Sequence, residues 1–244
     1  MGSRQRLALL ARVPWCLVVH CFSLPFMSDT SDNPLGGQAF RSALAELLGT
    51  FFLSLAALTI AAPLTPFAVG LTLLVFVYAV GSLSGAHLNP AVTVGLVVSR
   101  RFPFAHGLLY VVAQVAGALL ARLMVGAGLV GELGHSYQAG TVVAEFLGFG
   151  ILMITVAATT EKQVAKAGSG IAVGGALLAG LLVSHGVLNP AVALAMGLAT
   201  SPTIWATLLS AVIFSLIFNI IEHTKPAEVH DESAPTPTAK AYDL

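Results

Sequence analysis

The sequence predicts an all-α membrane protein in which six transmembrane helices and two re-entrant half-helices form an inverted repeat. Three observations lead to this fold class. The composition is strongly apolar, six apolar segments are each long enough to cross a bilayer, and an Asn-Pro-Ala motif occurs twice at a spacing of 100 residues. The length of the chain agrees with this fold class, because 244 residues leave room for about six spans of about 20 residues each with short loops.

The composition excludes most other classes of protein. Of the 244 residues, 57% are hydrophobic and 9% are charged, whereas soluble domains contain about 25% charged residues. The mean hydropathy is +0.89. Eleven basic and eleven acidic residues give zero net charge, so there is no basic surplus for the phosphates of nucleic acid. We expect neither a disordered chain, nor a disulfide scaffold, nor a soluble enzyme, and no nucleic-acid partner.

Residues 1–39 precede the regular pattern and form an N-terminal tail. Three arginines lead into a short apolar stretch at 13–26, which also holds Cys16 and Cys21. Three interpretations compete: a signal-like segment, a native amphipathic tail, or a start codon assigned too early, with Met27 as the true start. On each of them the tail carries no chemistry.

From Arg41 onward, apolar segments alternate with short polar loops. Six of these segments are long enough to span about 30 Å of hydrocarbon as helices, at roughly 43–62, 66–83, 104–126, 140–158, 168–184 and 203–221. Two pieces of about ten residues, 89–98 and 189–198, are too short to span. Each begins at Asn-Pro, and proline is favourable in the first turn of a helix, so we interpret them as half-helices.

The basic residues predict the orientation of the spans. Lysines and arginines of the core fall on one side if the spans alternate, at Arg41, Arg100, Arg101, Lys162, Lys166 and Lys225. Arg122, near the outer end of the third span, is the one exception, and its side chain can reach the interface there. We therefore expect a multi-pass protein of the plasma or inner membrane with both termini in the cytoplasm. The Pro-rich, charged tail at 223–244 is expected to be disordered.

The core is an internal duplication. Glu46 recurs as Glu145 within matching Ala-Glu contexts, and Asn89 recurs as Asn189. The first repeat covers 40–126, a linking loop 127–139, and the second repeat 140–222. Each repeat holds three spans, an odd number, so the second must enter the membrane upside down. The half-helices then meet N-terminus to N-terminus near the midplane.

That arrangement favours a neutral, hydrogen-bonding permeant. Each half-helix N-terminus carries roughly +0.5 of a charge, which repels cations. Asn89 and Asn189 cap the half-helices and keep amide N–H donors for a lumen. Irregular backbone at membrane depth is tolerated where it lines such a water-filled path.

The run from Ser84 to Val92, Ser-Gly-Ala-His-Leu-Asn-Pro-Ala-Val, closely resembles the first signature loop of the aquaporin (major intrinsic protein) family. The Ala-Glu-x-x-Gly-Thr run at 45–50 and Ala113-Gln114-x-x-Gly117 are similar to that family too. The resemblance covers residues 40–222. It implies six tilted helices and two half-helices around one pore per subunit, a homotetramer, and passive transport across the lipid bilayer.

The resemblance also assigns roles to residues. The pore motifs are Asn89, Pro90, Ala91, Asn189, Pro190 and Ala191. Loop carbonyls that line the pore belong to Gly85, Ala86, His87, His185, Gly186 and Val187. Buried residues that support the loops are Glu46, Glu145 and Gln114. A buried carboxylate needs a partner, and the alternative for the two glutamates is a proton relay, as in a coupled transporter.

The two loop histidines have competing interpretations. For His87 we favour fixing of the first loop over metal binding, because no second ligand has suitable spacing. His185 is either a pH-sensitive gate or a loop histidine bonded to a backbone carbonyl, and we favour the second. No cofactor and no metal is expected.

The resemblance also implies a selectivity filter, a narrow outer part of the pore, and its residues here depart from the family pattern. Most members carry arginine directly after the second Asn-Pro-Ala, and here that residue is Val192. The other inferred filter positions are Val69, Leu181 and Gly186, so all four are small or apolar. The ring lacks a fixed positive charge and a strong donor. Ala193 stands where glycerol-conducting members carry aspartate, which counts against a standard glycerol facilitator.

These observations predict a passive channel for water or another small uncharged solute, such as glycerol, ammonia, hydrogen peroxide or dissolved gas. Ions and protons are expected to be excluded. The alternatives are a channel for a neutral solute other than water, an ion-coupled transporter and a sealed structural protein. The sequence contains no nucleophile–base set, phosphate loop or metal cluster, so we do not expect an enzyme.

Overall fold

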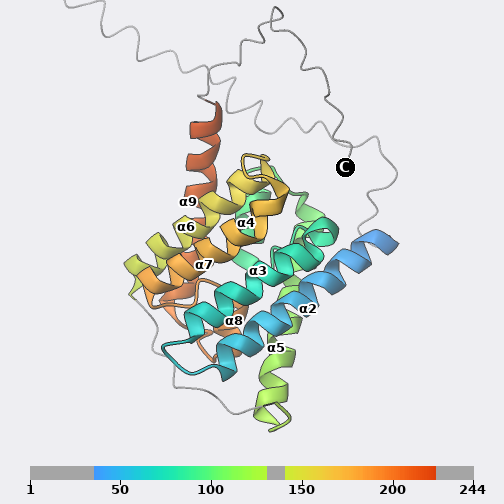
Figure 1. Ribbon diagram of the computed structural model, residues 1–244, viewed down its shortest axis with the longest axis vertical. Helices are drawn as coiled ribbons and strands as arrows, with labels where there is room; N and C mark the ends of the chain where they lie inside the picture. The colour runs from blue at the N-terminus through green and yellow to red at the C-terminus, as the bar shows by residue number, and fades with distance from the viewer. Residues whose placement is uncertain (1–35, 131–140, 224–244) are drawn as a thin grey trace, which may run out of the picture.

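The computed structural model describes residues 36–130 and 141–223, and within these ranges the regular structure is entirely helical (Figure 1). Six helices have the length and apolar composition of membrane spans. They are α2 (Gly37–Thr59), α3 (Thr65–Ser84), α5 (Phe104–Gly126), α6 (Val142–Thr160), α7 (Ser169–Ser184, preceded by the 3-10 turn η2, Lys166–Gly168) and α9 (Pro202–His223). Two short helices, α4 (Pro90–Val98) and α8 (Pro190–Ala195), follow the Asn-Pro motifs. The predicted fold class is confirmed.

Three boundaries differ from the prediction by three residues or more, and one of them is the end of α2, which lies at Thr59 and not at 62. Helix α2 begins at Gly37, inside the segment 1–39 that we expected to be tail. Helix α8 ends at Ala195, three residues before the expected end at 198. The cause at α8 is a Schellman motif: Gly197 takes a φ of 81°, and the Leu198 N–H bonds to the Ala193 carbonyl at 2.9 Å.

Some expectations concern residues outside the described ranges. These are the interpretations of the first 35 residues, with both cysteines, most of the linking loop at 127–139, and the tail from residue 224. They stay predictions.

Each half-helix packs against helices of the opposite repeat. Helix α4 lies against α9 as well as against α5 of its own repeat, and α8 lies against α5 and α2. The spans α3 and α7 approach closely where Gly70 faces Gly174, since a Cβ at Gly174 would lie 2.7 Å from the Gly70 carbonyl oxygen. The two repeats are therefore interleaved rather than placed side by side.

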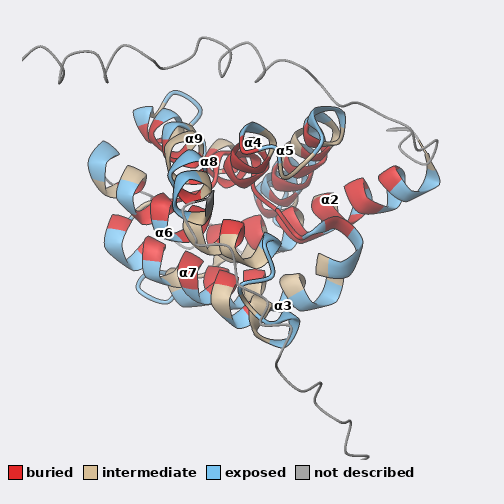
Figure 2. Cartoon of the chain, turned by 90° about the horizontal axis from the view of Figure 1, so that it is seen from above, coloured by how far each residue is buried: buried red, intermediate tan, exposed pale blue. Residues whose placement is uncertain are grey.

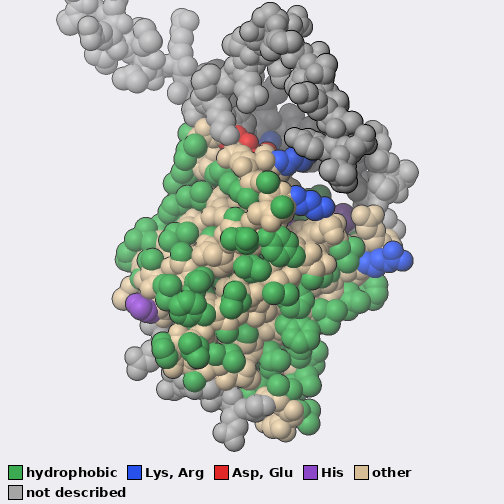
Figure 3. All heavy atoms as spheres, in the orientation of Figure 1, with side chains coloured by type: hydrophobic (Ala, Val, Ile, Leu, Met, Phe, Trp, Pro, Cys, Tyr) green, Lys and Arg blue, Asp and Glu red, His purple; other side chains and the backbone are tan. Residues whose placement is uncertain are grey.

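The outer surface is apolar, as contact with lipid requires. Buried residues gather where the helices face one another, and exposed ones lie on their outer faces (Figure 2). Large apolar side chains such as Phe104, Leu123 and Trp205 are exposed there. On the face drawn in Figure 3, lysine and arginine side chains lie only toward the end where α9 terminates.

Candidate functional site

The two half-helices begin next to each other in the centre of the molecule. Asn89 Nδ2 donates to the Leu188 carbonyl at 2.7 Å, and Asn189 Nδ2 donates to the Leu88 carbonyl at 2.9 Å. Both asparagines are buried. The structure thus brings together two motifs that lie 100 residues apart, through a reciprocal exchange of hydrogen bonds.

Each asparagine also caps its own half-helix. The Asn89 side-chain oxygen accepts from the Ala91 N–H at 2.9 Å, and that of Asn189 accepts from the Ala191 N–H at 3.0 Å. Pro90 and Pro190 occupy the first helical position, where a missing N–H costs nothing. A side-chain amide has two N–H groups, so the bond to the opposite loop leaves each asparagine with a second donor.

Glu46 holds the first loop. Its carboxylate accepts from the backbone N–H groups of His87 at 3.0 Å and Leu88 at 2.6 Å, and from the Ser84 hydroxyl at 2.7 Å. Gln114 Nε2 donates to the same carboxylate at 2.8 Å. Glu46 has no exposed surface, so these four donors replace the water that a buried carboxylate requires.

Glu145 holds the second loop in the equivalent way. It accepts from the Val187 N–H at 3.1 Å and the Leu188 N–H at 2.8 Å, with the Thr207 hydroxyl at 3.5 Å. Ser184 accepts from the Gly186 N–H, as Ser84 does from the Ala86 N–H. Sequence reasoning missed this pair of serines, although their spacing of 100 residues within the repeat was a usable signal.

The direction of these N–H groups fixes the direction of the loop carbonyls. In a trans peptide the N–H of one residue points opposite to the C=O of the residue before it. The N–H groups of His87 and Leu88 point at Glu46, so the carbonyls of Ala86 and His87 point away from it. By the same reasoning the carbonyls of Gly186 and Val187 point away from Glu145.

The carbonyls of Gly85 and His185 follow the same rule. The next N–H in each case bonds to a serine hydroxyl, that of Ser84 or of Ser184. Left-handed backbone recurs at matching places, with φ of 85° at Gly85 and 49° at His185. All six predicted carbonyls therefore turn from the supporting side chains.

The two histidines lie in different surroundings. His87 is buried, its Nδ1 lies 3.1 Å from the Thr93 hydroxyl, and its ring contacts those of Phe102 and Tyr110. His185 is exposed at the end of α7. Among the described residues, no group of three or more His, Cys, Asp or Glu side chains is arranged to hold a metal ion.

A cavity of about 400 Å³ lies beside the second motif. The four inferred filter residues line it, together with Asn189 at its base: Val69, Leu181, Gly186 and Val192. Gly186 has no side chain and therefore contributes only backbone to the cavity. A larger residue would not fit there, because an added Cβ would collide with Glu145. The structure thus gathers the four residues around one space.

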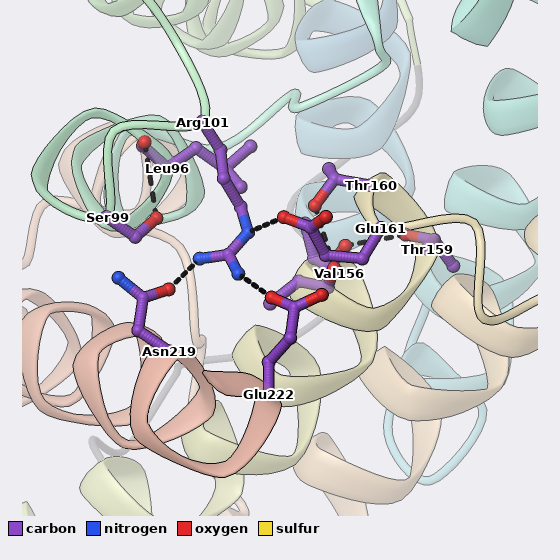
Figure 4. A network of polar contacts seen from close by, with 10 residues as sticks. Leu96, Ser99, Arg101, Val156, Thr159, Thr160, Glu161, Asn219 and Glu222 are labelled. Atoms are coloured by element: carbon purple, nitrogen blue, oxygen red, sulfur yellow. Dashed lines mark hydrogen bonds and ion pairs between the residues drawn. The ribbon is translucent and has the colours of Figure 1, made fainter. Parts of the chain in front are cut away.

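At the C-terminal end of the half-helix α4, away from Asn89, a cluster of charged side chains joins the two repeats (Figure 4). Arg101 Nε lies 2.6 Å from Glu161, its Nη2 lies 2.7 Å from Glu222, and its Nη1 bonds to Asn219. The guanidinium also lies over the Phe218 ring, 5.1 Å from the centroid. Apart from the basic pair Arg100 and Arg101, no sequence pattern predicted this cluster.

Comparison with known proteins agrees with the geometry. A family model described as major intrinsic protein matches residues 36–217. Aquaporin NIP1-4 of Oryza sativa subsp. japonica is 36% identical over 180 residues, which cover 65% of this chain and 66% of that relative, just under two thirds of its length. Nodulin-26 of Glycine max is 30% identical over 236 residues, covering 84% of this chain and 86% of that relative.

The fold agrees as well. The X-ray structure of the aquaglyceroporin from Plasmodium falciparum matches with a TM-score of 0.57 and 19% identity, covering 76% of this chain and 96% of that chain. The family model alone spans most of the described residues. The chain belongs to the major intrinsic protein family, and it is a multi-pass membrane channel for water or small solutes and not an enzyme.

Proposed function

We propose that the chain is a passive channel for water and small uncharged solutes, and that it excludes ions and protons at the two half-helix N-termini. The observation that carries this proposal is the reciprocal bonding of Asn89 to Leu188 and of Asn189 to Leu88. It brings two positive helix ends and two spare amide donors together. Such a centre favours a permeant with lone pairs and repels a cation.

The surroundings of the two glutamates support a scaffolding role. Both oxygens of Glu46 accept hydrogen bonds, and Glu145 accepts from two loop N–H groups. An ion-coupled transporter would need a carboxylate free to exchange protons or cations with the lumen. Carboxylates engaged in this way favour the channel over the transporter.

The cavity beside Asn189 is the proposed outer filter. It favours a second candidate, a channel that prefers a neutral solute to water, because Val192 and Leu181 present apolar surface and water crosses an apolar ring poorly. As part of the same proposal, the protein is a homotetramer of the plasma or inner membrane with cytoplasmic termini. Support for that orientation comes from Arg41, Arg100, Arg101, Lys162 and Lys166, which share one side in the sequence pattern.

Osmotic shrinkage of proteoliposomes, followed by stopped-flow light scattering, tests the proposal. We expect shrinkage faster than in empty liposomes, or uptake of a neutral solute such as glycerol above the empty-liposome rate. Folded protein that carries neither water nor any neutral solute would leave the sealed structural protein as the better description.

A cysteine variant tests whether the cavity is the path. Leu181→Cys places a thiol in the cavity, whereas Leu119→Cys places one on an exposed, lipid-facing position. In a background without Cys16 and Cys21, a mercurial should block flux through the first variant only. Equal sensitivity of both variants would argue against this path.

A further inference from the structure

We propose that the outer cavity selects small neutral amides with an alkyl group, the class of propionamide, over polyols of similar size. This inference rests on the proposed function, because it names the solute class of the same cavity. It follows from a count of the hydrogen-bond donors and acceptors at the base of the cavity, beside Asn189 and Val192.

Donors are scarce at this base. The Asn189 side chain accepts from the Ala191 and Val192 N–H groups and gives one of its two N–H groups to the Leu88 carbonyl, so one N–H is left. The side chain of Val192 offers no donor, and its N–H is bonded to Asn189. The N–H groups of Gly186 and Val187 are bonded to Ser184 and Glu145.

Acceptors are plentiful on the same side. Gly186 lines the cavity and has no side chain, and its N–H is engaged elsewhere, so its polar contribution is its carbonyl. The carbonyls of His185 and Val187 also belong to lining residues and turn from Ser184 and Glu145. Apart from the His185 imidazole, whose ring nitrogens can donate or accept, the loop therefore presents about three backbone acceptors for the single Asn189 donor.

The remaining wall is apolar. Leu53, Val69, Leu177 and Leu181 come from α2, α3 and α7 and face the loop across the cavity. Thr65 also lines it, but its hydroxyl donates to the Ile60 carbonyl at 2.7 Å. Polar groups thus come from one loop and apolar groups from the surrounding helices.

Amides match this inventory and polyols do not. A primary amide has two N–H donors and one carbonyl oxygen, and its nitrogen accepts no hydrogen bond. The loop carbonyls take both donors, the Asn189 N–H serves the single oxygen, and an alkyl group lies on the leucines and valines. The loop carbonyls can accept from the hydroxyl groups of glycerol, but its three hydroxyl oxygens share the single Asn189 N–H donor, and an unmatched polar group in an apolar site is costly.

A pair of isomers tests the donor count on the unmodified channel. Propionamide and N-methylacetamide have the same atoms, but the first has two N–H groups and the second has one. Uptake by proteoliposomes is recorded by stopped-flow light scattering for both isomers and for glycerol, and the rate of empty liposomes is subtracted. We expect the channel-mediated rate to be about two- to tenfold higher for propionamide than for its isomer, the factor that one hydrogen bond contributes, and higher than for glycerol.

A pair of variants tests whether the lack of a donor at position 192 causes the preference for amides. Val192→Arg adds a side chain with five donors, so the ratio of propionamide to glycerol permeability should fall severalfold. Val192→Met adds similar length without donors and should keep the ratio high. If Val192→Arg does not fold, the isomer comparison still decides the proposal.

The outcomes separate this inference from the proposed function. Glycerol carried as fast as propionamide, or N-methylacetamide as fast as its isomer, would overturn the amide preference and leave the channel intact. Water flux without any amide flux would do the same. Folded protein without flux of water, glycerol or amides would overturn the proposed function and this inference together.

Discussion

At the residue scale, the conformation of the two loops depends on buried polar side chains, which accept the hydrogen bonds that the loop N–H groups would otherwise make to water. Glu46 and Glu145 sit within apolar helices, yet each is surrounded by loop N–H groups. A carboxylate suits this task because it only accepts hydrogen bonds and has four lone-pair positions. An uncharged amide of the same shape has one oxygen and adds two unwanted donors.

Glu46→Gln therefore tests the support of the first loop. At least one loop N–H loses its acceptor, which costs about 1–3 kcal/mol in a buried site. We expect a lower melting temperature in detergent and reduced flux, and Glu145→Gln should act in the same direction through the second loop. Unchanged stability and flux in both variants would contradict the scaffolding role.

Asn189→Asp tests ion exclusion at the half-helix ends. The carboxylate still caps α8, because it can accept from Ala191, but it replaces the donor to Leu88 and brings a negative charge. Leakage of K⁺ should rise, measured with a potential-sensitive dye in proteoliposomes, and Asn89→Asp should do likewise. Tight exclusion in both variants would mean that the half-helix ends do not set the barrier.

At the scale of elements, close helix contacts set the positions of the loops. A Cβ at Gly148 of α6 would lie 2.6 Å from the Gly180 carbonyl oxygen of α7, so these helices touch backbone to backbone. Such contacts between small residues replace the hydrophobic effect as the source of helix association in lipid. Because Glu145 and Ser184 lie on the same two helices, their spacing depends on this contact.

Gly148→Val should separate α6 from α7. Overpacking of this kind costs about 1–3 kcal/mol, so we expect a lower melting temperature and less flux. Gly175→Ala is the control on α7, because its added Cβ would meet no atom within 4 Å. That substitution should keep or raise stability, since alanine is the better helix former. A harmless Gly148→Val would indicate that the contact adjusts freely.

At the scale of the whole molecule, the repeats are joined at two levels. The asparagine exchange links them in the centre, and Arg101 of the first repeat links them at one end through Glu161 and Glu222 of the second. The Arg101 side chain is 8% exposed, while those of Glu161 and Glu222 are 34% and 23% exposed. Arginine suits this place because its planar guanidinium presents five donors in fixed directions.

Arg101→Met should weaken this link. Two carboxylates lose their partner at a cost of about 1–3 kcal/mol, below that of a fully buried pair because solvent screens them. The melting temperature should fall, and the difference from the unmodified protein should shrink in high salt. Arg41→Met, at an exposed position, should have little effect. An equal effect of both substitutions would mean that the cluster contributes nothing specific.

Much of this architecture was predictable, and the failures have physical reasons. The six spans and the site of each half-helix follow from apolar length and the Asn-Pro motifs. The predicted end of α8 at 198 was wrong, although Gly197 in the sequence indicated an earlier helix end. The end of α4 at Val98 agrees with the prediction, although its Schellman geometry has Arg100, at a φ of 62°, in place of glycine, and composition could not reveal that motif.

The sequence by itself determined the fold class, the inverted repeat and the residue types at the centre, because these depend on local periodicity and on a duplicated motif. Only the tertiary structure decided which groups meet: that each asparagine bonds to the opposite loop, that the four residues proposed as the filter share one cavity, and that Arg101 joins Glu161 and Glu222. Contacts between residues 60 to 121 positions apart depend on how the repeats interleave, and hydrophobic pattern carries no information on that.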